Sequence, residues 1–302
     1  MTIRVLLILA LSMPVSVAGQ EITALGFVEG NIRLAFVRTN KDWEPSCFFA
    51  GQDRAMLLSD DSECAGKIMA WPWQVVDAKG RYTMLGPLIP IKHHYVSEAG
   101  LTAFTLPPGT ELKFDQSAAP RHTWMGKSAP PLLAVPSGTH VKRIQSEPGK
   151  SPEQNIRTQL IEQYFTKDRV FYTCGPAPDY TVHKRPANLS DVLVKPVRRF
   201  QGKTTFYEVS LNLPKDSQCD VVDTESELMA VKGDQIVNLT KPFRDQGGAF
   251  STSLTLFDGF LVSTENVQDT IFILFVGGYN RDGYALVDSA LNIKAVSMWG
   301  YH

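Results

Sequence analysis

Short runs in which apolar and polar residues alternate recur along much of this chain and predict an all-β fold. Residues 32–37 and 101–106 alternate in this way, with the period of two that is typical of a half-buried strand. Residues 71–76 and 81–85 flank a turn that contains Gly80, which predicts a β-hairpin. We therefore expect short, mostly antiparallel strands.

The C-terminal third of the chain is the most apolar part and predicts a four-stranded meander. The expected strands span residues 259–264, 270–276, 283–288 and 293–299, and short turns join them. A meander of this spacing is typical of one propeller blade or of one sheet in a sandwich. The chain has no convincing repeat of it upstream, so sandwich-like and propeller-like sheets both remain open.

One segment, near residues 152–165, has a clear helical pattern. Ser151 suits the N-cap, Pro152 the first helical position, and Gln154 completes a capping box. Apolar residues then recur at helical spacing, at Ile156, Leu160, Ile161, Tyr164 and Phe165. The sequence therefore predicts an amphipathic helix here.

Two segments rich in turn-forming residues divide the predicted strands. Residues 144–152 have the composition of a linker, which predicts two β-rich domains over residues 20–146 and 151–302, the second opening with the helix. Residues 118–136 contain four prolines, and proline removes a backbone donor, so we expect no central strand there.

The first nineteen residues predict an export signal. Arg4 supplies the positive charge, residues 5–11 are apolar but too few to span a bilayer, and residues 15–19 are small enough to suit signal peptidase. The alternative is a buried first strand. We expect a soluble, periplasmic or secreted protein that begins near Gln20 and has no transmembrane segment after cleavage.

The overall charge points to no particular partner. The chain has 30 Lys and Arg against 31 Asp and Glu, and this balance argues against nucleic acid, which needs a strongly basic face. A local basic stretch does occur, at Lys184, Arg185, Lys195, Arg198, Arg199 and Lys203. It is either a binding face or a set of charges that pair across neighbouring strands.

Four cysteines predict disulfide bonds in an oxidising compartment. They are Cys47, Cys64, Cys174 and Cys219. Three pairings are possible, and we favour the sequential one, Cys47–Cys64 and Cys174–Cys219. A zinc site is the weaker alternative, because the chain has no C-x-x-C or H-x-x-x-H spacing.

Catalytic signatures are absent from the sequence. It contains no G-x-S-x-G, S-x-x-K, H-E-x-x-H, P-loop or G-x-G-x-x-G motif. A carboxylate pair for glycoside hydrolysis could be drawn from Asp258, Glu265, Asp269 and Asp282, although acidic residues at strand ends are usually solvated. Residues 278–283 resemble part of a calcium loop but lack the ligands at its first and twelfth positions. We expect no cofactor and no metal.

Aromatic residues are the best candidates for a binding surface. Trp71 and Trp73 lie two apart on an extended segment, and His93, His94 and Tyr95 follow. If they are exposed, the two indole rings would form a platform for a sugar or a protein. The alternative is that both rings belong to the core of the first domain.

These features favour an exported, non-catalytic protein that binds another protein, for example an inhibitor or an immunity protein against an envelope-acting toxin. Export and disulfide rigidity suit a preorganised binder. Two alternatives remain, a hydrolase that acts on glycan or lipid in the cell envelope and a structural or surface-interaction module. The sequence does not indicate an oligomeric state.

Overall fold

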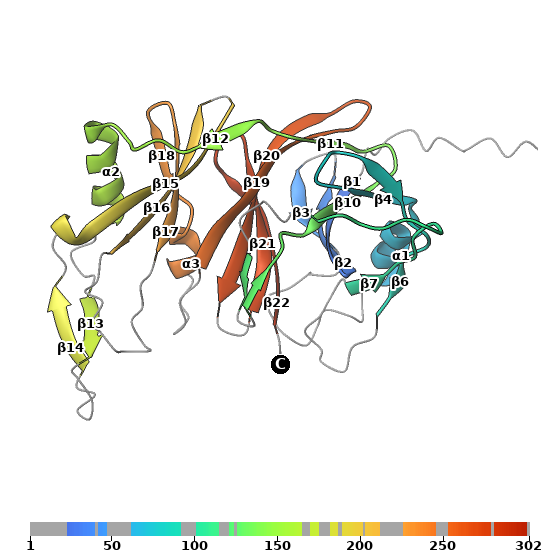
Figure 1. The fold of residues 1–302 in the computed structure, drawn as a ribbon, viewed down its shortest axis with the longest axis horizontal. Helices are drawn as coiled ribbons and strands as arrows, with labels where there is room; N and C mark the ends of the chain where they lie inside the picture. The colour runs from blue at the N-terminus through green and yellow to red at the C-terminus, as the bar shows by residue number, and fades with distance from the viewer. Residues whose placement is uncertain are drawn as a thin grey trace, which may run out of the picture.

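Three β-sheets and one helix stack as four successive layers (Figure 1). We call the sheets N-terminal, central and outer, and helix α2 (Gln154–Tyr164) covers the outer sheet. The structure is a computed structural model that describes residues 23–39, 42–46, 62–91, 101–114, 121–123, 126–164, 170–174, 182–186, 189–201, 203–211, 226–245, 253–278 and 281–300. The predicted all-β class is confirmed, since antiparallel strands dominate and the helices are few.

The N-terminal sheet has eight strands in the order β5-β4-β10-β1-β2-β7-β6, with β3 also pairing with β2. Its strands are β1 (Thr23–Glu29), β2 (Asn31–Arg38), β3 (Trp43–Pro45), β4 (Trp73–Val76), β5 (Tyr82–Met84), β6 (Ile89–Pro90), β7 (Leu101–Ala103) and β10 (Leu132–Pro136). Helix α1 (Ser62–Ala70) precedes β4. The predicted hairpin is confirmed as β4–β5, and Gly80 in its turn has a φ of 75°, which favours glycine.

This sheet curls into a half-barrel because its two edge strands are close in sequence. Only residues 85–88 separate β5 from β6, although the two strands lie at opposite edges. The connecting backbone bonds to both sides: the Leu85 amide donates to the Trp73 carbonyl, and the Gly86 amide donates to the Thr105 carbonyl, each at 2.9 Å. We call this closing point the seam.

Strand β10 corrects the expectation that the proline-rich segment holds no central strand. β10 lies between β4 and β1 in the N-terminal sheet. Its residues 132–135 contain no proline, while Pro130 and Pro131 precede the strand and Pro136 ends it. The prolines therefore bound the strand and leave the amides inside it free to pair.

The central sheet consists of β11 (His140–Arg143), β19 (Ser253–Ser263), β20 (Gln268–Gly278), β21 (Arg281–Asp288) and β22 (Ile293–Gly300). The last four strands confirm the predicted meander. Both faces of this sheet are buried, one against the N-terminal sheet and the other against the outer sheet. A strand that is buried on both faces reads as a continuous apolar run, which explains the composition of this region.

Strand β20 shows how one apolar run serves two cores. Ile271, Ile273 and Phe275 pack toward the N-terminal sheet, whereas Phe272, Leu274 and Val276 pack toward the outer sheet. In β19 the register shifts between Leu256 and Asp258, which reverses the faces toward which odd and even residues point. As a result Leu256 faces the outer sheet while Phe260, also at an even position, faces the N-terminal sheet.

The outer sheet repeats the strand order of the central sheet, with a short strand followed by a four-stranded meander. It consists of β12 (Ser146–Pro148), β15 (Val192–Phe200), β16 (Thr204–Leu211), β17 (Glu227–Lys232) and β18 (Gln235–Asn238). The predicted helix is confirmed, although α2 begins at Gln154, two residues later than expected. Leu160 and Tyr164 of α2 are buried in the cluster on the second face of the outer sheet.

The remaining described elements are short. They are the strand pairs β8 (Arg121–Thr123) with β9 (Gly126–Ser128) and β13 (Val170–Cys174) with β14 (Val182–Pro186), the 3-10 helix Leu189–Asp191, and α3 (Lys241–Asp245).

Contacts cross the predicted boundary between the two domains. The extended segment of residues 140–148 pairs first with β19 and then with β15, so part of the predicted linker is a strand. One hydrophobic cluster includes residues from both sides, and the ring of Tyr284 stacks on Phe27 with centroids 3.7 Å apart. The N-terminal and central sheets therefore share one core, while the boundary near residue 150 stays a prediction.

Candidate functional site

The tryptophans that the sequence offers as a binding platform lie at or near the core. Trp73 is only 1% exposed, and its indole N–H donates to the carbonyl of Ile68 at 2.9 Å. Trp71 is partly buried against the same cluster. The ring of Trp73 therefore belongs to the core, whereas part of Trp71 remains exposed to solvent.

The other residues predicted for binding or cross-linking lie largely outside the description. His93, His94 and Tyr95 fall in a segment that the structure does not describe, as do Cys47 and Cys219. Cys64 is in α1 and Cys174 ends β13, but the positions of their side chains are not described. The binding role of the first three and the disulfide pairing stay predictions.

The three aspartates among the four carboxylates considered for a hydrolytic pair lie far apart in the central sheet. All three can be placed along β20. Asp258 lies opposite Ile273, and Asp282 lies opposite Gly277. Asp269 is itself in β20, four residues before Ile273, and Gly277 is four residues after it. Four residues span about 13 Å of strand, well beyond the roughly 5–9.5 Å between the carboxyls of glycosidases. These aspartates therefore do not form that pair.

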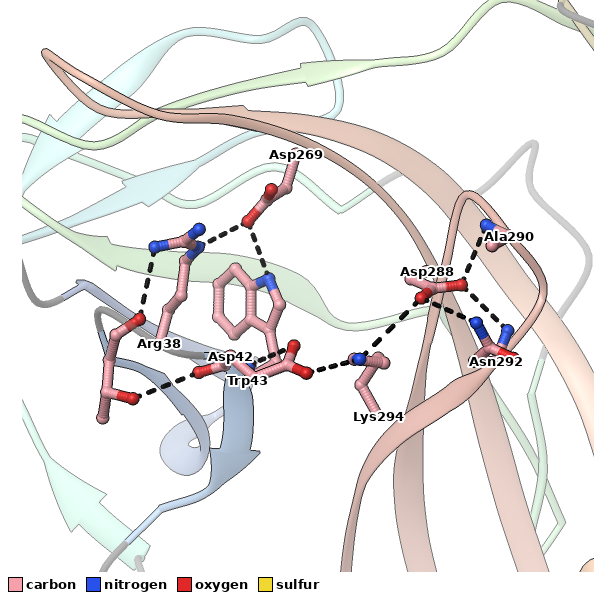
Figure 2. Close-up of polar contacts among 9 residues, drawn as sticks. Arg38, Asp42, Trp43, Asp269, Asp288, Ala290, Asn292 and Lys294 are labelled. Carbon is pink, nitrogen blue, oxygen red and sulfur yellow. Dashed lines mark hydrogen bonds and ion pairs between the residues drawn. The ribbon is translucent and has the colours of Figure 1, made fainter.

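Asp269 belongs instead to a polar cluster between the N-terminal and central sheets (Figure 2). The Arg38 Nε atom donates to Asp269 Oδ2 at 2.5 Å, and Trp43 Nε1 donates to the same oxygen at 3.0 Å. Arg38 is in β2 and Trp43 in β3, so one carboxylate of β20 holds two strands of the N-terminal sheet.

A second ion pair in the same cluster joins Asp42, the residue before β3, to the β21–β22 hairpin. The Lys294 ammonium contacts the carboxylate of Asp42 and lies 4.0 Å from Asp288 Oδ2. Asp288 also accepts hydrogen bonds from the Ala290 and Asn292 amides, each at 2.8 Å, which shapes the hairpin turn. Figure 2 shows Lys294 between the two acidic side chains.

Local interactions keep both members of this pair charged. Burial raises the pKa of Asp42, but the hydrogen bonds from Lys294 and the Trp43 amide outweigh it, so the pKa lies below its ordinary value. The hydrogen bond with Asp42 raises the pKa of Lys294. Groups shifted in these directions are fixed charges and not proton donors or acceptors near neutral pH.

A third charged group, centred on Asp258 of β19, links the central sheet to the outer sheet. Its carboxylate, 3% exposed as a residue, contacts Arg143 Nε of β11 at 2.8 Å and Arg198 Nη1 of β15 at 2.9 Å. It also accepts from the Gly259 amide at 2.8 Å. Burial raises the pKa of Asp258, and the two arginines only partly oppose that rise. We call this group the Asp258 clamp.

Two of the six cations in the basic stretch found in the sequence pair with acidic residues on a neighbouring strand. Lys195 of β15 lies opposite Glu208 of β16, with an ion pair of 3.4 Å, and Arg199 lies opposite Glu147 of β12 at the same distance. Arg198 belongs to the Asp258 clamp. Lys195 and Arg199 therefore fit the cross-strand alternative, whereas Arg198 pairs with a residue of the central sheet.

The seam of the half-barrel carries most of the exposed large apolar side chains that the structure describes. Tyr82 is 39% exposed, Met84 45% and Ile89 56%. Tyr82 and Met84 lie two residues apart on β5 and so project from the same face. The sequence predicted the β5 strand but not its position at a sheet edge, because edge position depends on pairings made far along the chain.

Searches for a metal site and for a membrane-spanning helix in the described part of the chain, and for similar proteins, gave no match. Among the described residues, no three His, Cys, Asp or Glu side chains gather closely enough to hold a metal ion. No helix in that part of the chain is long and apolar enough to cross a membrane. Comparisons with protein families, curated proteins and solved structures found no match to this chain.

Proposed function

We propose that this chain is an exported, non-catalytic protein that binds another protein. The observation that carries the proposal is the exposed apolar set at the seam, formed by Tyr82, Met84 and Ile89. Tyrosine and methionine are enriched in protein–protein interfaces relative to the rest of the surface. Isolated exposed apolar residues are ordinary, but these three lie within eight residues of one another, on the two edge strands that the seam connects.

The surroundings of Tyr82 support this proposal because they hold its ring in place. Its hydroxyl accepts from the Val141 amide at 2.7 Å and donates to the Val141 carbonyl at 3.0 Å. The ring also lies edge-on to His140, with centroids 6.1 Å apart. A side chain that is already ordered loses little conformational entropy when a partner binds.

The narrower role within this proposal is that of an inhibitor, such as an immunity protein against an envelope-acting toxin. An inhibitor works by occupying its target without being rearranged. Sheets that share buried cores on successive faces favour a rigid scaffold for that purpose.

Photocrosslinking tests the proposal directly. A photoreactive phenylalanine analogue replaces Met84 or Ile89 at the seam, and the matched control replaces Glu162, an exposed residue of α2 at the opposite end of the molecule (Figure 1). We expect one discrete protein adduct from the seam positions in producing cells and none from position 162. Equal adducts from all three positions, or turnover of a glycan or lipid by the purified chain, would contradict the proposal.

Export and disulfide formation are a separate part of the proposal. We expect the mature chain to begin near Gln20 and to contain no free thiol, with pairs Cys47–Cys64 and Cys174–Cys219. Intact mass of the exported protein, measured with and without reduction before alkylation, tests both points. Retention of residues 1–19, or alkylation before reduction, would contradict them.

A further inference from the structure

The outer edge of β5 exposes backbone groups in a defined pattern. The Asp77 amide bonds to the Arg81 carbonyl and the Leu85 amide bonds to the Trp73 carbonyl. In an antiparallel pair, bonded and non-bonded residues alternate, so the inward-bonding residues of β5 are those at odd positions. The amides and carbonyls of Tyr82 and Met84 therefore point away from β4.

No described strand occupies that outer edge, since β5 is the last strand in the order of the N-terminal sheet. Two residues with outward-facing backbone groups and exposed side chains are what an added strand requires: the backbone groups supply affinity, and alternate side chains supply specificity. Natural proteins often protect such an edge with proline or an inward charge, and residues 82–84 contain neither.

The charges beside this edge are mainly positive. Arg81 is paired with Asp77, at 2.6 Å, and Arg143 is held in the Asp258 clamp. Lys79 lies in the β4–β5 turn, and Lys142 comes directly after Val141, to which the Tyr82 hydroxyl bonds. Neither lysine has an ion-pair partner among the residues described. Two unneutralised cations near one strand edge favour an acidic partner.

We infer that the outer edge of β5 receives an extended, acidic segment of a partner protein, which pairs with Tyr82 and Met84 as an added strand. This inference rests on the proposed function and specifies how the partner is bound. The side chains of Tyr82 and Met84 contact alternate apolar residues of the added segment, and Lys79 contacts its carboxylates.

Two substitutions at one position separate backbone pairing from side-chain contact. Met84→Pro removes the outward-facing amide, and it leaves the bonds to β4 intact because those bonds use neighbouring residues. Met84→Ala removes the same side chain but keeps the amide. The pair is therefore matched, and thermal melting of both variants checks that each remains folded.

The probe is a fluorescein-labelled synthetic peptide of about ten residues in which valine alternates with glutamate. Its counterparts alternate valine with serine and valine with lysine. Fluorescence anisotropy measures binding of each peptide to the full mature chain, to the two Met84 variants and to Lys79→Glu.

We expect the glutamate peptide to bind at least about tenfold more tightly than the lysine peptide, with the preference reduced in Lys79→Glu. Met84→Pro should weaken binding by about tenfold or more, and Met84→Ala by less. Absence of binding at about 1 mM peptide, equal binding to Met84→Pro, or preference for lysine would overturn the inference.

Two other outcomes distinguish this inference from the proposed function. If the photocrosslinked partner still binds Met84→Pro unchanged, the chain is a binding protein but β5 does not pair with its partner. If the chain forms a dimer that Met84→Pro dissolves in sedimentation, the edge receives a second copy of this chain, and the inference of an acidic partner segment is wrong.

Discussion

The hydroxyl of Tyr82 takes the place of a neighbouring strand for the backbone of Val141. The amide and carbonyl of Val141 point away from β19, because the Ile144 amide bonds to the Gly259 carbonyl and sets the alternation along β11. Tyr82 bonds to both groups. One side chain on the edge of the N-terminal sheet thus caps the edge of the central sheet.

The variant Tyr82→Phe tests this cap. It keeps the ring but removes both hydrogen bonds, which leaves a partly buried amide and carbonyl without their partner, so we expect a loss of about 1–3 kcal/mol in the free energy of unfolding. Urea denaturation measures the loss. Met84→Ala on the same face is the control, since Met84 is more exposed and makes no such bond; equal effects from the two variants would show that the hydroxyl is unimportant.

The Asp258 clamp predicts a cost when the carboxylate alone is removed. Asp258→Asn keeps the shape but leaves Arg143 and Arg198 without their anion, which costs about 3–5 kcal/mol in a fully buried pair. The side chains of these arginines are 42% and 26% exposed, so water partly replaces the anion, and we expect about 2 kcal/mol. Chemical denaturation provides the measurement.

The control for the clamp is the exposed pair Lys195–Glu208. Its lysine side chain is 73% exposed, so Lys195→Gln should change the free energy of unfolding by less than about 0.5 kcal/mol. A larger loss in this variant than in Asp258→Asn would contradict the role given to burial.

Acid should weaken the contact between β3 and the β21–β22 hairpin. The pKa of Asp42 lies below its ordinary value in the folded protein, so its contribution to stability is present above the unfolded pKa, about 3.9, and is lost as pH falls through the folded pKa. Asp42→Asn should therefore show a shallower decline in unfolding free energy between about pH 5 and pH 2.

The size of this acid effect should be small because Asp42 is 42% exposed in its side chain, and we expect a difference below about 1 kcal/mol. Urea midpoints measured across that pH range, for the wild type and Asp42→Asn, give the comparison. A steeper acid decline in the variant would contradict the direction of the pKa shift.

Much of the fold follows from local sequence patterns, whereas the arrangement of the layers does not. The run from Ile271 to Val276 identified a buried strand, but only the packed structure shows that alternate residues enter different cores. Likewise the prolines around residue 132 marked boundaries that we interpreted as a barrier to β10. Local patterns report the element; which face meets which sheet depends on distant segments.

The candidate site was harder to predict for the same reason. The ion pair between Arg38 and Asp269 joins residues 231 positions apart, and no spacing rule links them. The sequence around Trp73 was compatible with a binding platform and with a core position. In the structure Trp73 is buried beside Ile68, so it is a core residue. The exposed edge at Tyr82 arises only because the N-terminal sheet ends there.

Closure of the seam should depend on the absence of a side chain at position 86. A methyl group at Gly86 would overlap the Thr105 hydroxyl and approach its Cβ atom to 3.3 Å. Gly86 is not among the residues with positive φ, so the obstacle is steric and not conformational. We expect Gly86→Ala to destabilise the protein by about 1–3 kcal/mol, the usual cost of overpacking.

A double-mutant cycle identifies the cause of that loss. Thr105→Ala removes the overlapping hydroxyl, so Gly86→Ala should cost about 1 kcal/mol less in that background, a coupling typical of residues in contact. Gly66→Ala in α1 is the control, because no atom lies within 4 Å of its added methyl group and alanine favours a helix, so it should be neutral or slightly stabilising. Urea denaturation of the four proteins in the cycle measures the coupling. Full additivity of the two substitutions would show that residues 86 and 105 do not meet, and the half-barrel would then not close at this point.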